Sequence, residues 1–203
     1  VSLGAGCQRS ESKEAASAGP SEQKSVAPAP AQVQEIKLGQ VMPYSGPASA
    51  YGTIGRLESA YFAMVNRKGG VNGRKVNLIS LDDSYSPPKA VEQVRKLVEQ
   101  DKVLAIVNPV GTPSNTAIRK YLNDKQVPQL FVSSGASKWN DPQNYPWTIG
   151  FNPSYRLEGR TYAEHIMKTQ PRSKVAVLYQ ADDFGKDLLA GLKAVSYTHL
   201  RAH

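Results

Sequence analysis

The chain has 203 residues, and its 25 Lys and Arg against 17 Asp and Glu give a formal net charge of +8 with His neutral. This length suits one domain or two small ones, and a hydrophobic fraction of 40% is enough for a packed core, which excludes disorder throughout. One Cys excludes a disulfide framework, no run reaches the roughly 20 apolar residues that cross a bilayer, and the basic residues are scattered among acids, which argues against nucleic-acid binding.

The first 34 residues differ in composition from the rest. Residues 1–34 consist mainly of Ala, Ser, Pro, Gln, Glu and Lys and contain no aromatic residue. Such a stretch cannot bury enough apolar surface to offset the entropy of ordering it, so we expect a flexible linker. Its start, Val1 to Cys7, resembles the end of a bacterial lipoprotein signal peptide whose earlier parts lie upstream of Val1. The resemblance implies that Cys7 is lipidated and holds the protein at a membrane surface. The alternative is an unmodified Cys in a disordered tail.

From residue 36 onward the sequence predicts alternating strands and helices. Residues 36–41 alternate apolar and polar side chains as a strand does. The helix that follows carries Ile54, Leu57, Tyr61, Met64 and Val65 on one face. The series continues with a strand at 76–81, a helix from Pro87, a strand at 103–107 that is apolar enough to be covered on both faces, a helix after Pro113 and a strand at 130–132. This alternation predicts a doubly wound α/β sheet with parallel strands.

The pattern pauses at residues 133–153 and then resumes. That stretch is rich in Ser, Gly, Asn, Asp, Pro and Trp, and a loop of this length is usually functional. A helix at 155–169, a strand at 175–179 and a helix that includes Val195 follow. We therefore assign residues 35–148 to a first lobe and residues 149–195 to a hinge and the beginning of a second lobe. The second lobe is incomplete, because one strand and two helices cannot build a covered sheet.

The last eight residues, 196–203, continue no helical periodicity. They resemble the translation of a transposase sequencing adaptor, so we expect an artefact that interrupts the final helix. The alternative is the frayed end of a natural helix. On the first interpretation, His199 and His203 belong to no functional site.

The sequence lacks the patterns that accompany catalysis. The glycines between residues 46 and 55 do not have the spacing of a dinucleotide site, and no phosphate-binding Gly-Lys-Ser/Thr sequence occurs. Ser133 and Ser134 could act as nucleophiles, but His165 lies inside a predicted helix and no Gly-x-Ser-x-Gly turn is present. The acidic pairs at 82–83 and 182–183 suit the capping of backbone N–H groups better than a metal site. The sequence thus predicts no metal, no cofactor and no enzymatic activity.

The residues that follow the predicted strands suit a small ligand. In an open parallel sheet, ligands bind beyond the carboxyl ends of the strands, where helix N-termini direct N–H groups outward. The residues at these ends are small, hydroxyl-bearing or aromatic: Tyr44, Ser45 and Tyr51 after the first strand, then residues 110–114, 133–137 and 182–185. Such a lining suits a small carboxylate with an apolar body.

Several motifs occur in one order along residues 35–195: Met42 to Pro47, Tyr51-Gly52, Gly69 to Lys75, Asp82-Asp83 and Asp183 to Lys186. Together they resemble the type I periplasmic binding proteins of ABC transporters for branched-chain amino acids, the leucine-binding family. Residues 131–139 and 152–155 resemble a branch whose members also bind aromatic or other organic acids. The resemblance implies two similar lobes that close on a ligand about a hinge near residues 147–151. It also implies docking on an ABC permease, in the periplasm or at the cell surface.

The resemblance assigns a ligand site to particular residues. Backbone groups around Gly111 and Thr112, with the loop Gly135-Ala136-Ser137, would hold the ligand carboxylate, and Tyr51 and Phe184 would form walls from the two lobes. Phe184 stands where leucine-binding members usually have Tyr, so no hydroxyl is implied there. As structural alternatives, Thr112 and Ser137 cap helices, and Tyr51 and Phe184 belong to a core. The leading rival function is a sensory ligand-binding domain of the same fold, and the second rival is an enzyme that uses Ser133 or Ser134.

Overall fold

The computed structural model describes residues 35–200, with the backbone alone for 196–200. The predictions of a linker at 1–34, of a lipidated Cys7 and of an artefact at 201–203 therefore lie outside the described residues.

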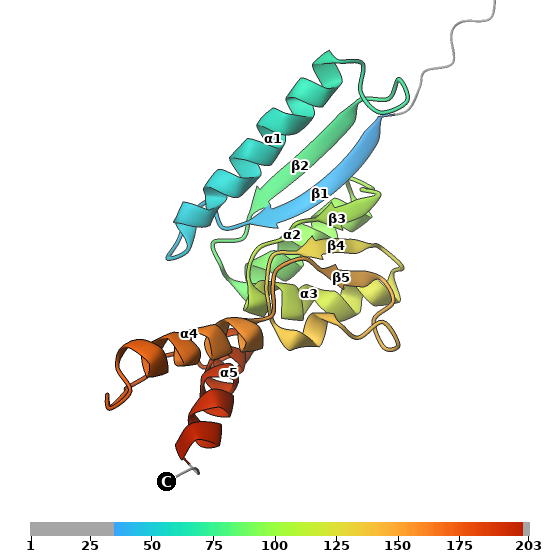
Figure 1. The fold of residues 1–203 in the computed structure, drawn as a ribbon. Helices are drawn as coiled ribbons and strands as arrows, with labels where there is room; N and C mark the ends of the chain where they lie inside the picture. Colours follow the sequence, from blue (N-terminus) through green and yellow to red (C-terminus); the bar gives the residue numbers. More distant parts are fainter. Residues whose placement is uncertain (1–34, 201–203) are drawn as a thin grey trace, which may run out of the picture. The chain divides into compact units, whose positions relative to one another are not determined.

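Five parallel strands form one sheet in the order β2-β1-β3-β4-β5 (Figure 1). The strands are β1 (Ile36–Met42), β2 (Val76–Asp82), β3 (Ala105–Val107), β4 (Gln129–Val132) and β5 (Thr148–Gly150). β1 pairs with β2 along its whole length, from Ile36 opposite Val76 to Met42 opposite Asp82. The predicted parallel α/β sheet is confirmed. Its strand order reverses direction between β1 and β3, and in open sheets ligands bind at such a point, beyond the carboxyl ends of the strands.

Helices cover both faces of this sheet (Figure 1). They are α1 (Gly52–Arg67), preceded by the 3-10 turn η1 (Ser49–Tyr51), α2 (Pro87–Glu99) and α3 (Thr112–Asp124), and a second 3-10 turn, η2 (Ser137–Trp139), follows β4. Successive side chains of β1 point to opposite faces. Gln40 donates to Glu58 of α1, whereas Val41 packs with α2 and α3. α1 therefore lies on one face of the sheet, and α2 and α3 lie on the other.

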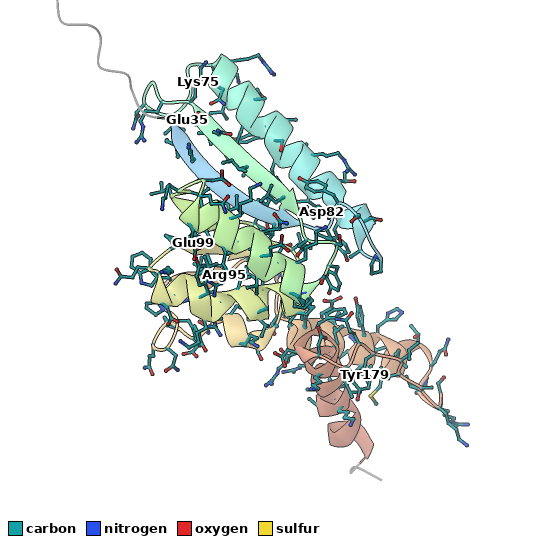
Figure 2. All side chains as sticks on the ribbon, turned by 180° about the vertical axis from the view of Figure 1, so that it is seen from behind. Glu35, Lys75, Asp82, Arg95, Glu99 and Tyr179 are labelled. Carbon is teal, nitrogen blue, oxygen red and sulfur yellow. The ribbon has the colours of Figure 1, made fainter. Side chains whose placement is uncertain are left out.

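The core lies between the sheet and the pair α2–α3, which Figure 2 shows from behind. Its fully buried side chains come from strands and helices alike: Val41, Ile106, Val94, Leu97, Ile118 and Leu122. The helical members recur at intervals of three and four residues, which places them on one stripe of each helix. The helices predicted from Pro87 and after Pro113 are therefore confirmed.

The inner face of α1 differs from the prediction. Leu57 and Tyr61 are 68% and 57% exposed, and the buried positions are Gly52 and Gly55. The reason is the close approach of Tyr44 beneath the helix, because a Cβ at Gly55 would lie 2.2 Å from the Tyr44 hydroxyl. The spacing of the apolar residues predicted which side of α1 is buried, but in the structure the side with Gly52 and Gly55 faces the sheet.

The predicted strand at 175–179 is wrong. After α4 (Tyr155–Thr169), residues 174–180 form no strand before α5 (Asp183–Leu200) begins. A strand needs a neighbour for its backbone hydrogen bonds, and none of β1–β5 pairs with this segment. It runs instead beside α4 and α5, where Tyr179 lies in Figure 2, with Leu178 fully exposed.

Three boundaries also differ from the sequence-based predictions. β5 forms inside the stretch predicted as a loop, and it includes three of the five residues predicted as a hinge, so residues 151–154 make the connection to α4. α5 continues to Leu200 rather than being interrupted at residue 196, because residues 196–200 contain no Gly or Pro to break it. Within the described residues, no helix combines the length and apolarity that membrane crossing requires.

Candidate ligand-binding cleft

A cleft of about 560 Å³ opens at the carboxyl edge of the sheet. Its lining comes from the ends of the first-lobe strands and from α4 and α5, and consists of Pro47, Ala48, Tyr51, Tyr85, Val110, Gly111, Thr112, Ser133, Asn152, Tyr155, Glu158, Gln180 and Phe184. Four of the seven ligand-binding residues predicted from the sequence lie here: Tyr51, Gly111, Thr112 and Phe184. The cleft thus brings together Tyr51 and Phe184, which are 133 positions apart in the sequence.

Gly111 shapes the floor of the cleft at the start of α3. Its φ of +101° lies in a region that L side chains rarely adopt. A Cβ here would also lie 2.6 Å from the ring of Tyr85, so the ring packs directly on the backbone. At the start of α3, Pro113 has no N–H group and the Gly111 N–H donates to the Ser133 carbonyl at 3.3 Å. The N–H of Thr112, at the positive end of the helix dipole, is therefore the main-chain donor that this part of the lining can offer, and the bare backbone of Gly111 lets a ligand approach it.

Thr112 lines the cleft with its backbone, because its hydroxyl binds Ser134. The residue is 2% exposed, and its Oγ1 lies 2.7 Å from the Oγ of Ser134. The same Ser134 oxygen accepts a hydrogen bond from the indole Nε1 of Trp139 at 2.8 Å. These buried contacts occupy the hydroxyls of both Thr112 and Ser134, so the polar groups that α3 offers to the cleft are main-chain ones.

Aromatic rings supply the apolar part of the lining. Tyr51 is 57% exposed in the 3-10 turn before α1, and Phe184 lies in the first turn of α5. Phe184 and Tyr155 meet edge to face with their ring centroids 4.8 Å apart. Burial raises the pKa of Tyr85, so its hydroxyl stays a neutral donor in the physiological range. Tyr85 and Tyr155 were missed by the sequence analysis, because no local motif shows which tyrosines face a cleft.

The acidic pair after β2 organises the loop that carries Tyr85. Asp82, labelled in Figure 2, accepts hydrogen bonds from the backbone N–H groups of Tyr44 and Ser45 at 2.9 and 3.1 Å, and Asp83 accepts from that of Tyr85 at 3.0 Å. Partial burial opposes ionisation of Asp82, but hydrogen bonds from Ser45 and Lys89 hold its pKa well below the ordinary value. Asp83 is more deeply buried, and this burial raises its pKa. The pair binds backbone N–H groups as predicted, but these belong to loops rather than to a helix start, because the N-cap of α2 is Ser86.

The other three predicted ligand-binding residues, Gly135, Ala136 and Ser137, lie at an adjoining groove of about 380 Å³. The Gly135 carbonyl accepts the N–H of Tyr155 at 2.8 Å, and a Cβ on Gly135 would lie 2.2 Å from the carbonyl oxygen of Pro153. Small residues are therefore needed here because the chain enters α4 directly against them.

Ser137 binds a carboxylate that belongs to the protein itself. Its backbone N–H donates to Asp187 of α5 at 2.7 Å and its hydroxyl donates at 3.3 Å. Arg156 of α4 donates to the same carboxylate at 2.8 Å. Burial alone would raise the pKa of Asp187, but the bonds from Ser137 and Arg156 lower it. These contacts join the loop after β4 to both α4 and α5, and they give the Ser137 N–H group a partner other than a ligand.

Comparisons with known proteins identify the family and the fold of the chain. A family model described as periplasmic binding protein matches residues 35–197. An amino acid binding protein of Pseudomonas aeruginosa is 25% identical, and the match covers 79% of this chain and 43% of that protein. The leucine-specific-binding protein of Salmonella typhimurium is 26% identical, and the match covers 78% of this chain and 42% of that protein. The crystal structure of a substrate-binding periplasmic protein from Ralstonia solanacearum superimposes with a TM-score of 0.74 at 25% identity, over 82% of this chain and 47% of the other.

The chain spans less than half the length of these relatives. The match of the family model over most of the chain, the parallel sheet and the shared fold lead to one conclusion. The chain belongs to the periplasmic binding protein family and has the type I fold of that family.

Proposed function

We propose that this chain is part of a substrate-binding protein that delivers a small carboxylate, an amino acid or a related organic acid, to an ABC importer. The observation that carries the proposal is the cleft at the carboxyl edge of the sheet. Its lining combines the bare start of α3 at Gly111 with the aromatic rings of Tyr51 and Phe184. Main-chain N–H groups at a helix N-terminus suit a carboxylate, and the rings suit an apolar body.

The relatives support the choice of ligand class. The two curated relatives are named for amino acid binding and for leucine binding, and the family-model match at residues 35–197 includes every residue that lines the cleft. We propose that Tyr51, Gly111, Thr112 and Phe184 contact the ligand. The loop Gly135-Ala136-Ser137 adjoins the ligand and fixes the two helices that complete the cleft.

The proposed mechanism is closure of two lobes on the ligand. The cleft lining already includes residues on both sides of the connection at 151–154, so a ligand in it touches α3 and α5 at once. A ligand drives closure only through contacts that favour the closed state over the open one. The closed form then docks on a permease outside the cytoplasm, and lipid on Cys7 holds the protein at the membrane. An unmodified Cys7 in protein made by a lipidating host would contradict the anchor.

The ligand class is tested by isothermal titration calorimetry. The intact protein of which this chain is part is titrated with leucine, isoleucine, phenylalanine, urea and benzoate. We expect heat of binding with at least one carboxylate and none with urea, because urea has no anionic group for the start of α3. Absence of heat with every carboxylate would contradict the proposal.

A further inference from the structure

The amino edge of the sheet, where the strands begin and the helices end, collects exposed basic side chains from four segments. In a parallel sheet all strands begin at the same edge, so residues that are scattered along the sequence come together there. We call this surface the basic edge; its cations lie at the end of α1, before β2, before β3 and at the end of α3, and they are Arg67, Lys68, Lys75, Lys102 and Lys125.

Hydrogen bonds hold these segments next to one another. The carbonyl of Lys75 accepts the N–H of the first residue of β1 at 2.8 Å, and the carbonyl of Lys37 in β1 accepts the N–H of Leu104 at 2.8 Å. The side chain of Asn66 in α1 bonds the N–H and the carbonyl of the first residue of β2 at 2.8 and 2.7 Å. The end of α1 and the starts of β1, β2 and β3 therefore form one continuous surface.

The cations of the basic edge lack acidic partners. Within the part of the chain whose side chains are described, no salt bridge involves any of the five. Two acids near this edge are already paired, Asp124 with Lys120 at 2.7 Å and Glu99 with Arg95 at 3.6 Å. The other acids there are Glu35 and Asp101, too few to neutralise five cations.

The carboxyl edge, where the cleft opens, has no such excess of positive charge. Lys89, Lys138 and Arg156 lie near it, and each pairs with an acid. Among the described residues, the cleft lining contains no Lys, Arg or His. Figure 2 shows Glu35 and Lys75 at one end of β1 and β2 and Asp82 at the other. The positive charge is thus concentrated at the edge away from the cleft.

The chain also enters the sheet at the basic edge. The first strand begins there at Ile36, and Cys7, the proposed site of lipid attachment, precedes it in the sequence. One acyl chain gives only marginal membrane binding, and a basic patch is one of the signals that make such binding lasting. The basic edge is therefore the surface of this domain that the linker joins and the one whose charge suits an anionic membrane.

A structural role explains only some of these cations. Basic residues near a helix C-terminus stabilise the helix dipole, and Lys68 and Lys125 are the C-caps of α1 and α3. Lys75 and Lys102 precede strands instead, so the helix dipole gives no reason for their charge.

We propose that the basic edge binds the anionic headgroups of a phospholipid surface and directs the cleft, at the opposite edge of the sheet, away from the lipid. This inference rests on the proposed function for the lipid on Cys7 and adds a second, electrostatic contact with the membrane. Each Lys or Arg close to an anionic surface strengthens binding about fivefold, so a few exposed cations on one edge have a measurable effect.

The test is co-sedimentation with lipid vesicles. The intact protein of which this chain is part carries Cys7→Ser, so that no acyl chain contributes to binding. The vesicles contain phosphatidylcholine alone or equal parts of phosphatidylcholine and phosphatidylglycerol. We expect binding to the anionic vesicles only, and its loss in about 1 M salt, where the Debye length is about 3 Å.

Two combined variants separate position from net charge. The first joins Lys68→Gln, Lys75→Gln and Lys102→Gln at the basic edge. The matched control removes three exposed cations around the end of α4, and consists of Lys168→Gln, Arg172→Gln and Lys174→Gln. We expect the first to weaken binding to anionic vesicles more than about tenfold and the control to change it less than about threefold, with both melting temperatures close to that of the unsubstituted protein.

Three outcomes would overturn the inference: no binding to the anionic vesicles at low salt, equal binding to both kinds of vesicle, or equal weakening by the two combined variants. None of them bears on the cleft, because calorimetry with carboxylates tests the proposed function separately on the same protein. Absence of heat with every carboxylate would in turn contradict the proposed function and leave the vesicle result standing.

Discussion

The sheet with α1–α3 and the helix pair α4–α5 differ in what holds them together. In the first region Val41, Leu97 and Ile106 are completely buried in one apolar core. In the second, Leu178 is fully exposed and Leu157 is 58% exposed, so much of the apolar surface has no cover among the described residues. The two regions meet through polar contacts such as that between Ser137 and Asp187. The comparison suggests that stability resides in the first region and that ligand binding depends on the junction.

The core of the first region should be the most sensitive to truncation. Leu97→Ala removes a fully buried side chain between α2 and the sheet, so we expect it to lower the free energy of unfolding by about 2–5 kcal/mol. Leu104→Ala is the matched control, because Leu104 is 66% exposed and its truncation should change the free energy by less than about 0.5 kcal/mol. Urea denaturation measures both. Equal losses would contradict the location of the core.

The floor of the cleft should be next in sensitivity. Gly111→Ala places a Cβ against the ring of Tyr85 and forces Ala to a φ of +101°. Gly69 has the same φ of +101° and open space around it, so Gly69→Ala carries the backbone strain alone. We expect each substitution to cost about 1–3 kcal/mol of stability, with a larger loss for Gly111→Ala. Only Gly111→Ala should also weaken binding of leucine. Similar binding by both variants would contradict the role of Gly111 in the cleft.

The junction should respond to removal of the Asp187 charge with little effect on the core. Asp187→Asn weakens the bonds from Ser137 and Arg156, so amide protons of α5 should exchange roughly tenfold faster while those of β1 keep their protection. Asp183→Asn is the control, because the side chain of Asp183 is 48% exposed against 10% for Asp187, so its ion pair with Lys138 should contribute less than about 1 kcal/mol. Uniform acceleration in β1 and α5 would show that the two regions unfold as one.

The same junction should be sensitive to acid. The pKa of Asp187 is lower in the folded chain than its ordinary value, so its contribution to stability is complete above the pKa of the unfolded chain, about 3.9. That contribution is lost as the pH falls through the lower pKa of the folded state. The difference between Asp187→Asn and the unsubstituted chain should therefore shrink below about pH 4. A difference that does not change with pH would contradict the charged state of Asp187.

The strands and helices of the first region could be predicted from the sequence, because local periodicity reflects one buried face per element. Val94 and Leu97 recur with helical spacing, and both are buried. Elements that depend on distant partners could not be predicted. Residues 175–179 read as a strand but have no neighbour to pair with, and the buried side of α1 is set by Gly55 against Tyr44.

The candidate site was accessible to sequence reasoning only in part. Gly111 follows a predicted strand, Phe184 lies in the motif Asp183 to Lys186, and both line the cleft. Glu158 carries no motif, and its position depends on how α4 packs on α5 through Gly159. The hydrogen-bond partner of Ser137 is Asp187, 50 residues further along the chain, and no local sequence pattern predicts that contact.

The central claim is that ligand binds in the cleft between the strand ends and α4–α5. The most direct measurement is a map of backbone amide shifts in the isotopically labelled 203-residue chain during titration with leucine. We predict that the largest shifts fall at Tyr51, Gly111, Thr112 and Phe184, with smaller ones along the loop 135–137. A second groove, lined by Ala163, Met167 and Pro171, lies away from the cleft. Shifts confined to that groove, or shifts on only one side of the 151–154 connection, would contradict binding in a shared cleft.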